Sequence, residues 1–375
     1  MRGHEFQGES LMRYLELMSS LVCGAIVASG AWAQLPAGYP ADYAKSVDAA
    51  KKEGKVVVYS TTDAKLVTPL IKDFEAAFPG VKVEYTDLNS TEVYNRFVSE
   101  NAANATSADA VWSSAMDLQM KLAADGLAAP YKSPESAALP DWARWKDTVY
   151  ATTFEPIAIV YNKRLVPAED VPKTHADFTK LLNTKAEKYQ KKVTTYDAEK
   201  SGVGFMLVNQ DAKLNPAFWD LVKAMGARGV NMQSSTGTMM ERVSSGENLI
   251  GYNILGSYAL TRAKKDPSIG IAFTTDYNLV LSRLVFLAKN ARNPNAGKLW
   301  VDYLLSKRGQ TIAAEQAELY SVRTDMTGKD SGQGFAKDLG NAVKPIAVND
   351  QLLQALDQTK RLEFLKQWQT ALGRK

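Results

Sequence analysis

Hydroxyl-bearing residues and glycines gather at four places in this 375-residue chain where a predicted strand gives way to a predicted helix. A helix N-terminus presents unpaired backbone N–H groups and the positive end of the helix dipole, so several of them could bind an anion without a basic side chain. Each cluster can also be an ordinary helix cap, worth about 1 kcal/mol. The candidate ligand-binding residues in these clusters are Thr61, Thr62, Ser113, Ser114, Ser201, Gly202, Ser235, Thr236 and Thr238.

Two charged residues lie in predicted apolar strands. Glu155 precedes Pro156 and the apolar run 157–160, and Arg283 lies within the apolar stretch 279–287. A buried charge needs a partner. Glu155 could accept hydrogen bonds from the hydroxyl or ammonium groups of a ligand, or it could form an internal ion pair with Arg283. Both residues are therefore candidate ligand-binding residues, with the internal pair as the alternative.

An aromatic and polar stretch follows the predicted strand 249–252. Tyr252 and Asn253 are expected to line a pocket. Tyr258 has helical spacing to Arg262 and is expected in the core instead.

Composition and motifs exclude several classes of function. Basic and acidic residues number 45 and 41, without a tail of like charge, so we expect no nucleic-acid partner. Two histidines and one cysteine are too few for a zinc site. The chain lacks the nucleotide-binding and catalytic motifs that we searched for, so we expect no cofactor and no enzymatic activity.

The N-terminus is typical of an export signal. Residues 12–33 have a short basic start, an apolar run and a small-x-small site, which predicts a signal peptide over residues 1–33 with cleavage after Ala33. Cys23 could be lipidated instead, but the bulky residues before it argue against this. The mature chain then lacks cysteine, which fits an oxidising periplasm. Translation could start at Met1 or Met12.

Alternating strands and helices predict an α/β fold. A strand at 56–59, a helix from Leu66 to Phe78 and a strand at 81–85 form a βαβ unit, which requires a parallel sheet. No linker divides the chain, so we expect two lobes joined by continuous strands. The predicted boundaries are 34–153 plus 277–325 for lobe 1, 154–276 for lobe 2, and 326–375 for a C-terminal helical segment packing on both lobes.

The order of several short motifs resembles the periplasmic solute-binding proteins of bacterial ABC importers, in the branch that holds ferric-ion, phosphonate and sugar-phosphate binders. The matching stretches are 56–60, 108–111, 160–163, 245–247, 296–305, 307–310 and 320–323. The resemblance implies two α/β lobes that close on a ligand and deliver it to a membrane permease driven by an ATPase. We expect a monomer that carries a small organic anion, phosphorylated or carboxylated.

Two alternatives remain beside this interpretation. Iron-binding members of the family resemble one another in an adjacent tyrosine pair, which this chain lacks, although Tyr252 and Tyr258 could still bind ferric iron. Where those proteins often place arginine near the crossing strand, this chain has Thr153-Phe154-Glu155. The second alternative is an exported hydrolase that uses carboxylates such as Glu155.

Overall fold

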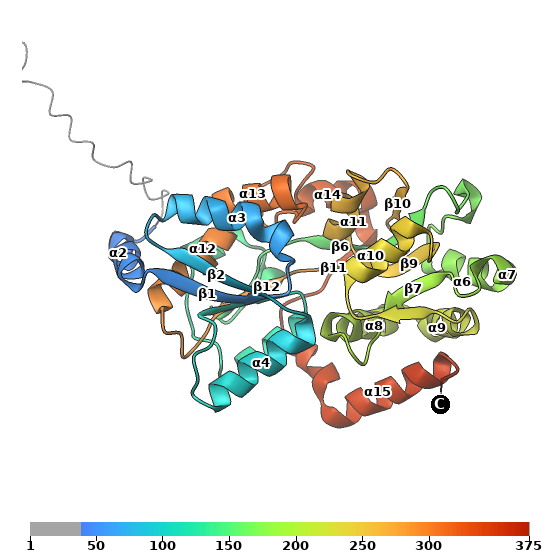
Figure 1. The fold of residues 1–375 in the computed structure, drawn as a ribbon, viewed down its shortest axis with the longest axis horizontal. Helices are drawn as coiled ribbons and strands as arrows, with labels where there is room; N and C mark the ends of the chain where they lie inside the picture. Colours follow the sequence, from blue (N-terminus) through green and yellow to red (C-terminus); the bar gives the residue numbers. More distant parts are fainter. Residues whose placement is uncertain (1–38, 375) are drawn as a thin grey trace, which may run out of the picture. The chain divides into compact units, whose positions relative to one another are not determined.

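A computed structural model describes residues 39–374 of the chain (Figure 1). The predicted signal peptide, with Cys23 and the cleavage site after Ala33, lies outside the described residues. Residues 40–375 belong to one structural unit. No helix in the described part is long and apolar enough to cross a membrane.

The first lobe is built on a six-stranded sheet. Strand β1 lies between β2 and β3 and pairs in parallel with both, so the predicted βαβ unit is confirmed. Parallel pairing brings the carboxyl ends of β1, β2 and β3 to one edge of the sheet. In order across the sheet, the strands are β2 (Lys82–Asp87), β1 (Lys55–Ser60), β3 (Ala110–Ser113), β12 (Leu284–Leu287), β5 (Val149–Ala151) and β4 (Arg144–Trp145).

The second lobe is built on a seven-stranded sheet in which parallel and antiparallel pairs mix. Strand β7 pairs in parallel with β8 and β9, whereas β6 is antiparallel to β9, β10 and β11. The strands are β13 (Val343–Pro345), β11 (Asn278–Leu281), β6 (Glu155–Asn162), β9 (Ile250–Leu255), β7 (Val193–Tyr196), β8 (Asn231–Gln233) and β10 (Ile269–Ala272). The predicted class, two α/β lobes, is confirmed.

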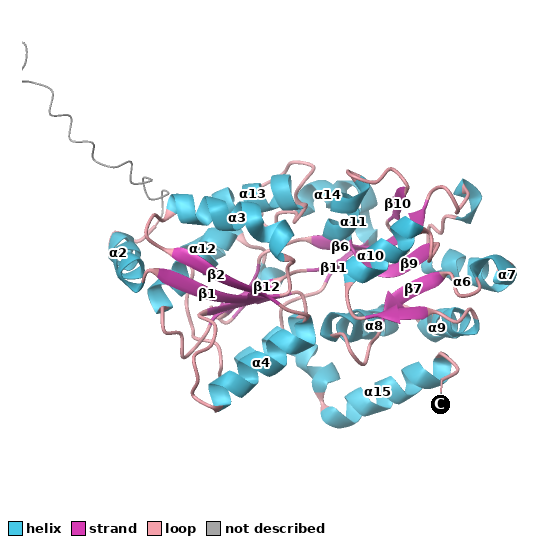
Figure 2. Ribbon diagram, in the orientation of Figure 1, coloured by secondary structure: helices cyan, strands magenta, loops and turns pink. Residues whose placement is uncertain are grey.

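Helices pack on the faces of both sheets (Figure 2). In the first lobe they are α2 (Tyr43–Glu53), α3 (Ala64–Ala77), α4 (Ser90–Ala102), α5 (Met116–Ala124), α12 (Pro294–Leu305) and α13 (Lys307–Ala317). In the second lobe they are α6 (His175–Thr184), α7 (Ala186–Tyr189), α8 (Gly202–Leu214), α9 (Phe218–Ala227), α10 (Thr236–Ser245) and α11 (Gly256–Ala263). The C-terminal stretch adds α14 (Gly332–Leu339) and α15 (Gln358–Ala371), and short 3-10 helices cover 134–138, 141–143, 168–170, 340–342 and 350–356.

Local sequence accounts for the start of one helix and the end of another in the first lobe. Helix α4 begins with a capping box in which Asn89 accepts from the N–H of Glu92 and the Glu92 side chain accepts from the N–H of Asn89. Helix α3 ends just before Pro79 and Gly80, and Gly80 has a φ of +97°, which an L side chain rarely adopts. These signals fix where α4 begins and where α3 ends.

Two crossings between the lobes lie side by side. The chain leaves the first sheet after β5 and enters the second at β6, and it returns between β11 and β12. The crossings are hydrogen bonded to each other: Arg283 N donates to Thr153 Oγ1 at 2.8 Å, and Thr152 N donates to the Arg283 carbonyl at 2.9 Å. The apolar stretch 279–287, which we expected as one strand, is therefore two strands in two sheets.

The C-terminal stretch contacts both lobes. Strand β13 extends the second sheet beside β11, and α15 packs on α9 with Trp368 fully buried. The 3-10 helix 350–356 packs on α5 of the first lobe. The exact division of the chain into lobes stays a prediction.

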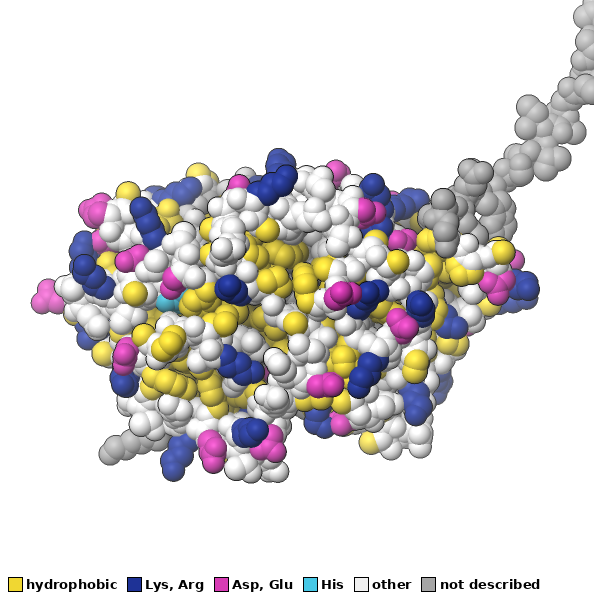
Figure 3. Space-filling view, turned by 180° about the vertical axis from the view of Figure 1, so that it is seen from behind, with side chains coloured by type: hydrophobic (Ala, Val, Ile, Leu, Met, Phe, Trp, Pro, Cys, Tyr) yellow, Lys and Arg dark blue, Asp and Glu magenta, His cyan; other side chains and the backbone are white. Residues whose placement is uncertain are grey.

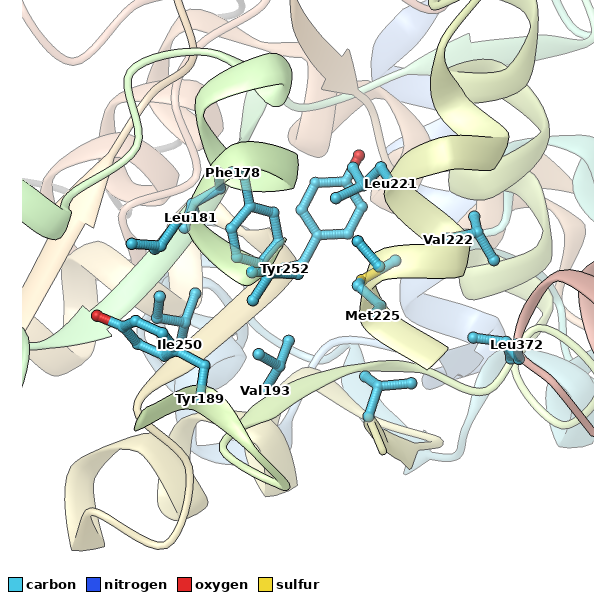
Figure 4. Packing of buried hydrophobic residues seen from close by; sticks show 14 of the residues in the cluster. Phe178, Leu181, Tyr189, Val193, Leu221, Val222, Met225, Ile250, Tyr252 and Leu372 are labelled. Carbon is cyan, nitrogen blue, oxygen red and sulfur yellow. The ribbon is translucent and has the colours of Figure 1, made fainter. Parts of the chain in front are cut away.

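The core of the second lobe gathers apolar side chains from its sheet and its helices (Figure 4). Tyr252 of β9 belongs to this core, with its ring 5.7 Å from that of Phe178 between centroids. Basic and acidic side chains are interspersed over the face in Figure 3, in keeping with the balanced charge of the sequence.

Asp117 of α5 is a buried carboxylate near the seam between the lobes. It is 2% exposed, its Oδ1 accepts from the N–H of Leu118 at 2.8 Å, and its Oδ2 has no hydrogen-bond partner among residues 39–374. Burial raises the pKa of Asp117 to about 7, although the charges of Arg361 and Lys213 oppose the shift. The folded protein therefore prefers the protonated acid.

This preference predicts that Asp117 makes stability depend on pH. An unfolded aspartate has a pKa of about 3.9, so the unfolded chain binds fewer protons than the folded one between roughly pH 4 and pH 7, and stability falls as pH rises through that window. Asp117→Asn should therefore raise the free energy of unfolding relative to the wild type by about 2 kcal/mol more at pH 8 than at pH 5. Urea unfolding at both pH values measures this, and the surface substitution Asp220→Asn is the control. An equal effect of Asp117→Asn at both pH values would contradict it.

Candidate functional site

A cavity lies between the carboxyl edge of the first sheet and the second lobe. Its volume is about 120 Å³. The first lobe contributes Thr61, Asp63, Asp87, Leu88, Asn89, Ser90 and Ser114, and the second contributes Tyr196, Val203, Ser234, Ser235, Thr236, Gly237, Leu255 and Tyr258. In open α/β sheets ligands bind beyond the carboxyl ends of the strands, so this cavity is the candidate binding site.

The first lobe presents two of the predicted hydroxyls to this cavity. Thr61 and Ser114 follow the neighbouring strands β1 and β3, and their hydroxyls lie 3.1 Å apart. Thr62 and Ser113 were predicted with them, but both point into the protein: Thr62 Oγ1 accepts from Arg283, and Ser113 Oγ accepts from the N–H of Ala115. Successive side chains of a strand point to opposite faces, so Thr61 and Ser114 lie on one side and Thr62 and Ser113 on the other.

The second lobe presents the N-terminus of α10. Ser235 caps the helix by accepting from the N–H of Thr238 at 3.2 Å, and Thr238 Oγ1 lies 3.0 Å from the same oxygen. The Thr236 hydroxyl forms a hydrogen bond with the Tyr196 hydroxyl. Thr236 and Gly237 line the cavity, and their N–H groups have no acceptor among residues 39–374. The cluster is thus a helix cap that leaves two donors free.

The predicted pair at the start of α8 does not line the cavity. Ser201 Oγ accepts from the N–H of Gly204, and the N–H of Val203 donates across to Ser90 Oγ of the first lobe at 3.2 Å. A Cβ on Gly202 would lie only 2.6 Å from Leu118 Cδ1, so the lobes meet closely here. These donors are used in contacts within the protein, and Val203 is the residue that reaches the cavity.

The three candidate residues at and after the predicted strand 249–252 divide between two cavities. Tyr258, predicted to be core, lines the cavity between the lobes. Tyr252 and Asn253 line a much smaller cavity inside the second lobe, with a volume of about 10 Å³. The reason is a register shift where β9 pairs with β6, at which Asn253 takes a φ of +60°.

The side chains of Tyr252 and Asn253 donate hydrogen bonds to a buried carboxylate that lines the same smaller cavity. Asp211 Oδ2 accepts from the Tyr252 hydroxyl at 2.9 Å and from Asn253 Nδ2 at 2.8 Å, and its Oδ1 accepts from the Tyr277 hydroxyl at 2.9 Å. Burial raises the pKa of Asp211. The structure therefore does not bring Tyr252 and Tyr258 together, and residues 39–374 hold no cluster of three His, Cys, Asp or Glu side chains placed to bind a metal.

Glu155 and Arg283 form the internal ion pair. Both side chains are fully buried, with Arg283 Nε 2.9 Å from Glu155 Oε1 and Nη2 donating to Oε2 at 3.2 Å. Neither residue lines the cavity. Glu155 also accepts from the hydroxyls of Thr153 and Ser257, and Arg283 Nη1 donates to the Thr61 carbonyl at 3.2 Å.

This ion pair sits directly behind the cavity. Arg283 holds the backbone of Thr61, and Ser257 is the neighbour of Tyr258, whose ring centroid lies 5.8 Å from the Arg283 guanidinium carbon. The pair thus positions one cavity residue from each lobe. Its effect on a ligand would be indirect.

Two acidic residues that the sequence did not single out line the cavity. Asp63 Oδ1 accepts from the Tyr258 hydroxyl at 2.7 Å, which links the two lobes, and Asp87 Oδ2 accepts from the N–H of Ala64, the first residue of α3, at 3.0 Å. Burial and the charge of Asp63 raise the pKa of Asp87, although the hydrogen bond from Ala64 opposes them. Asp87 ends β2, and parallel pairing with β1 was the signal that could have placed it here.

Comparison with known proteins identifies the family. A model described as "Bacterial extracellular solute-binding protein" matches residues 69–339. The crystal structure of the substrate binding protein of the ABC transporter from Agrobacterium tumefaciens is 40% identical and has a TM-score of 0.82, over 85% of this chain and 94% of that one. The chain belongs to the bacterial extracellular solute-binding proteins. The predicted solute-binding protein of an ABC importer is confirmed.

More distant structures share the fold of this solute-binding protein. The periplasmic binding protein AfuA from Actinobacillus pleuropneumoniae, with exogenous fructose-6-phosphate bound, is 20% identical with a TM-score of 0.71, over 86% of this chain and 99% of that one. Iron-bound HitA from Pseudomonas aeruginosa is 18% identical with a TM-score of 0.65, over 84% and 99%. Proteins of one fold thus hold chemically different solutes, so the solute must be argued from the site.

The buried ion pair predicts a large effect of removing one charge only. Glu155→Gln should lower the free energy of unfolding by about 3–5 kcal/mol, because it leaves the Arg283 charge buried without its counter-ion. Adding Arg283→Met to this variant should recover a substantial part of the loss. Urea unfolding of the single and double variants measures both effects. A loss below about 1 kcal/mol in Glu155→Gln would show that the pair is not buried in solution.

Proposed function

We propose that this solute-binding protein carries a small organic anion, phosphorylated or carboxylated and bearing hydroxyl or amino groups, in the cavity between its lobes. The observation that carries the proposal is the N-terminus of α10, where Thr236 and Gly237 line the cavity and their N–H groups have no acceptor among the described residues. The hydroxyls of Thr61 and Ser114 lie on the opposite wall.

The other predicted residues divide between contact and support. Thr61, Ser114, Ser235 and Thr236 would contact the solute, whereas Thr62, Ser113, Ser201, Gly202, Thr238, Glu155 and Arg283 would hold the walls. In this proposal Glu155 does not accept hydrogen bonds from the hydroxyl or amino groups of the solute. Its carboxylate already bonds to Arg283, Thr153 and Ser257.

Delivery follows from closure of the lobes. Tyr258 of the second lobe bonds Asp63 of the first, and Ser90 accepts from Val203 across the seam. A solute that contacts both walls favours this closed arrangement by its difference in affinity for the closed and open forms. The permease and its ATPase would then recognise the closed monomer in the periplasm, after removal of the signal peptide at Ala33.

Two alternative functions, ferric-iron binding and hydrolysis, can be distinguished by experiment. Ferric iron bound through Tyr258 would give a visible tyrosinate charge-transfer band on addition of ferric citrate. A hydrolase would turn over phosphate esters repeatedly.

The identity of the solute class can be tested by a thermal-shift screen of the mature protein. The panel is glucose 6-phosphate, glucosamine 6-phosphate, propylphosphonate, 3-aminopropylphosphonate, propionate, β-alanine, citrate and ferric citrate. A solute at 100 times its dissociation constant adds about 2.7 kcal/mol to the free energy of unfolding. The hits then serve as probes for variants.

A charge at position 237 tests the role of α10. A Cβ at Gly237 meets only Ser235 Oγ, at 3.9 Å, so Gly237→Asp and Gly237→Asn fit equally and differ only in charge. Two like charges 5 Å apart repel by roughly 3 kcal/mol at an effective dielectric of 20. Calorimetric affinity for the anionic hits should therefore be at least about tenfold weaker in Gly237→Asp than in Gly237→Asn. Equal affinity in the two variants would refute the anion-binding role of α10.

A further inference from the structure

We propose that Asp117 takes up a proton from the solvent when the lobes close, so that acidic solutions favour the closed form. Asp117 is the buried carboxylate at the start of α5, and it does not line the cavity. This inference rests on the lobe closure in the proposed function, and it is independent of the chemistry of the solute.

Asp117 lies where the first lobe meets the second. The residue after it, Leu118, is so close to the start of α8 that a Cβ on Gly202 would lie 2.6 Å from Leu118 Cδ1. The same Cβ would lie 3.6 Å from the Cβ of Ala115, two residues before Asp117. The first turn of α5 is thus packed against the second lobe, and Asp117 is 2% exposed.

The carboxylate of Asp117 is incompletely hydrogen bonded at this seam. Its Oδ1 accepts from the N–H of Leu118 at 2.8 Å, and its Oδ2 has no hydrogen-bond partner among residues 39–374. Burial removes water from an ionised carboxylate, which disfavours the charged form unless donors or cations replace that water. The closed seam therefore favours the protonated acid.

Two basic residues act on Asp117 from the second-lobe side of the seam. Lys213 belongs to α8, and the guanidinium carbon of Arg361 in α15 lies 4.2 Å from the ring centroid of Phe205 in α8. Burial raises the pKa of Asp117 to about 7, and the two charges oppose this rise without cancelling it. The protonation of Asp117 therefore depends on whether the second lobe covers it.

The other charged residues of α5 and of the elements packed against it have partners of their own. These elements are α4, α8, β12 and the 3-10 helix 350–356, and β12 has no titratable residue. The contacts are Lys121 with Asp125, Glu92 with the N–H of Asn89, Arg96 with Glu100, Asp211 with Tyr252, and Asp350 with Trp145. None of these contacts involves Asp117.

A neutral acid in a permanent core would not respond to closure. The contacts around Asp117 join the two lobes, however: the N–H of Val203 in α8 donates to Ser90 Oγ of α4, next to the contact of Gly202 with Leu118. Opening the lobes breaks these contacts and admits water to the seam. The pKa of Asp117 then returns toward about 3.9, the ordinary value for an aspartate.

The sign and size of the effect follow from this difference in pKa. Between roughly pH 4 and pH 7 the closed form binds one more proton than the open form, so closure weakens as pH rises through this window. The equilibrium constant for closure should fall by up to roughly a hundredfold from pH 5 to pH 8. Above this window the two forms bind the same number of protons and the dependence ends.

A disulfide across the seam provides the closed form for the test. The mature chain, residues 34–375, contains no cysteine of its own. A Cβ at position 202 would lie 3.1 Å from Ser90 Oγ, so the double variant Ser90→Cys, Gly202→Cys places its two sulfurs within reach of a disulfide. Oxidation locks α4 to α8, and the reduced double variant is the matched control.

Bulky side chains at the seam and in the cavity provide the open form. Gly202→Trp introduces a side chain that the closed seam cannot hold, and Gly237→Trp places one in the cavity between the lobes. Both wedged variants should have a larger radius of gyration by small-angle X-ray scattering than the oxidised double variant. Gly328→Trp is the control, because a Cβ there meets nothing within 4 Å.

The measurement is the pKa of Asp117 by carbon-13 NMR of the aspartate carboxyl groups, with Asp117→Asn in each background to assign the resonance. We expect a pKa of about 7 in the locked protein and a value at least about 2 lower in the wedged variants. Gly328→Trp should match the wild type. Thermal unfolding identifies the folded variants, and either wedged variant suffices.

The outcomes separate this inference from the proposed function. Equal pKa values of Asp117 in the locked and wedged proteins would overturn it, and so would a pKa of about 4 in the locked protein. Failure of the double variant to oxidise, or unchanged scattering of both wedged variants, would show that the lobes do not meet and part at this seam, which also overturns it. These measurements need no solute. Failure of every anion in the thermal-shift panel to bind would contradict the proposed function and leave the proton site at Asp117 in place.

Discussion

The buried ion pair between Arg283 and Glu155 lies where the chain crosses between the lobes. Removing two charges from water costs several kcal/mol per ion, so such a pair persists only when good geometry and additional hydrogen bonds complete it. Here those bonds come from the Thr61 carbonyl and the Thr62, Thr153 and Ser257 hydroxyls. The requirement to satisfy one ion pair therefore fixes the strand ends of the first lobe and the start of α11 in the second.

The ion pair also explains the charge of the cavity. Arg283 lies behind the cavity wall as the partner of Glu155, and its charge opposes the rise in the pKa of Asp87 that burial causes. On the opposite wall, the free N–H groups of α10 favour negative charge.

Much of the fold could be predicted from the sequence, because hydrophobic periodicity and helix caps are local signals. The βαβ unit at the start of the first sheet and the two α/β lobes are confirmed. The stretch 279–287 was misjudged, because its apolar pattern cannot show that Ser282 and Arg283 leave one sheet for the other. That break depends on the hydrogen bonds of these residues to Thr153, 129 and 130 positions away in the chain.

For the site, the sequence by itself determined which residue types were available: hydroxyl clusters at helix starts, and a charged pair in apolar surroundings. Tertiary structure alone decided which of them line the cavity between the lobes. It buried Thr62, Ser113, Ser201 and Glu155 in contacts within the protein, moved Tyr258 from the expected core to the cavity, and added Asp63 and Asp87. The physical reason is that a helix cap and a ligand contact use the same local sequence. Whether a donor remains free depends on distant groups, such as Ser90 of α4, which only folding brings within hydrogen-bond distance of Val203 in α8.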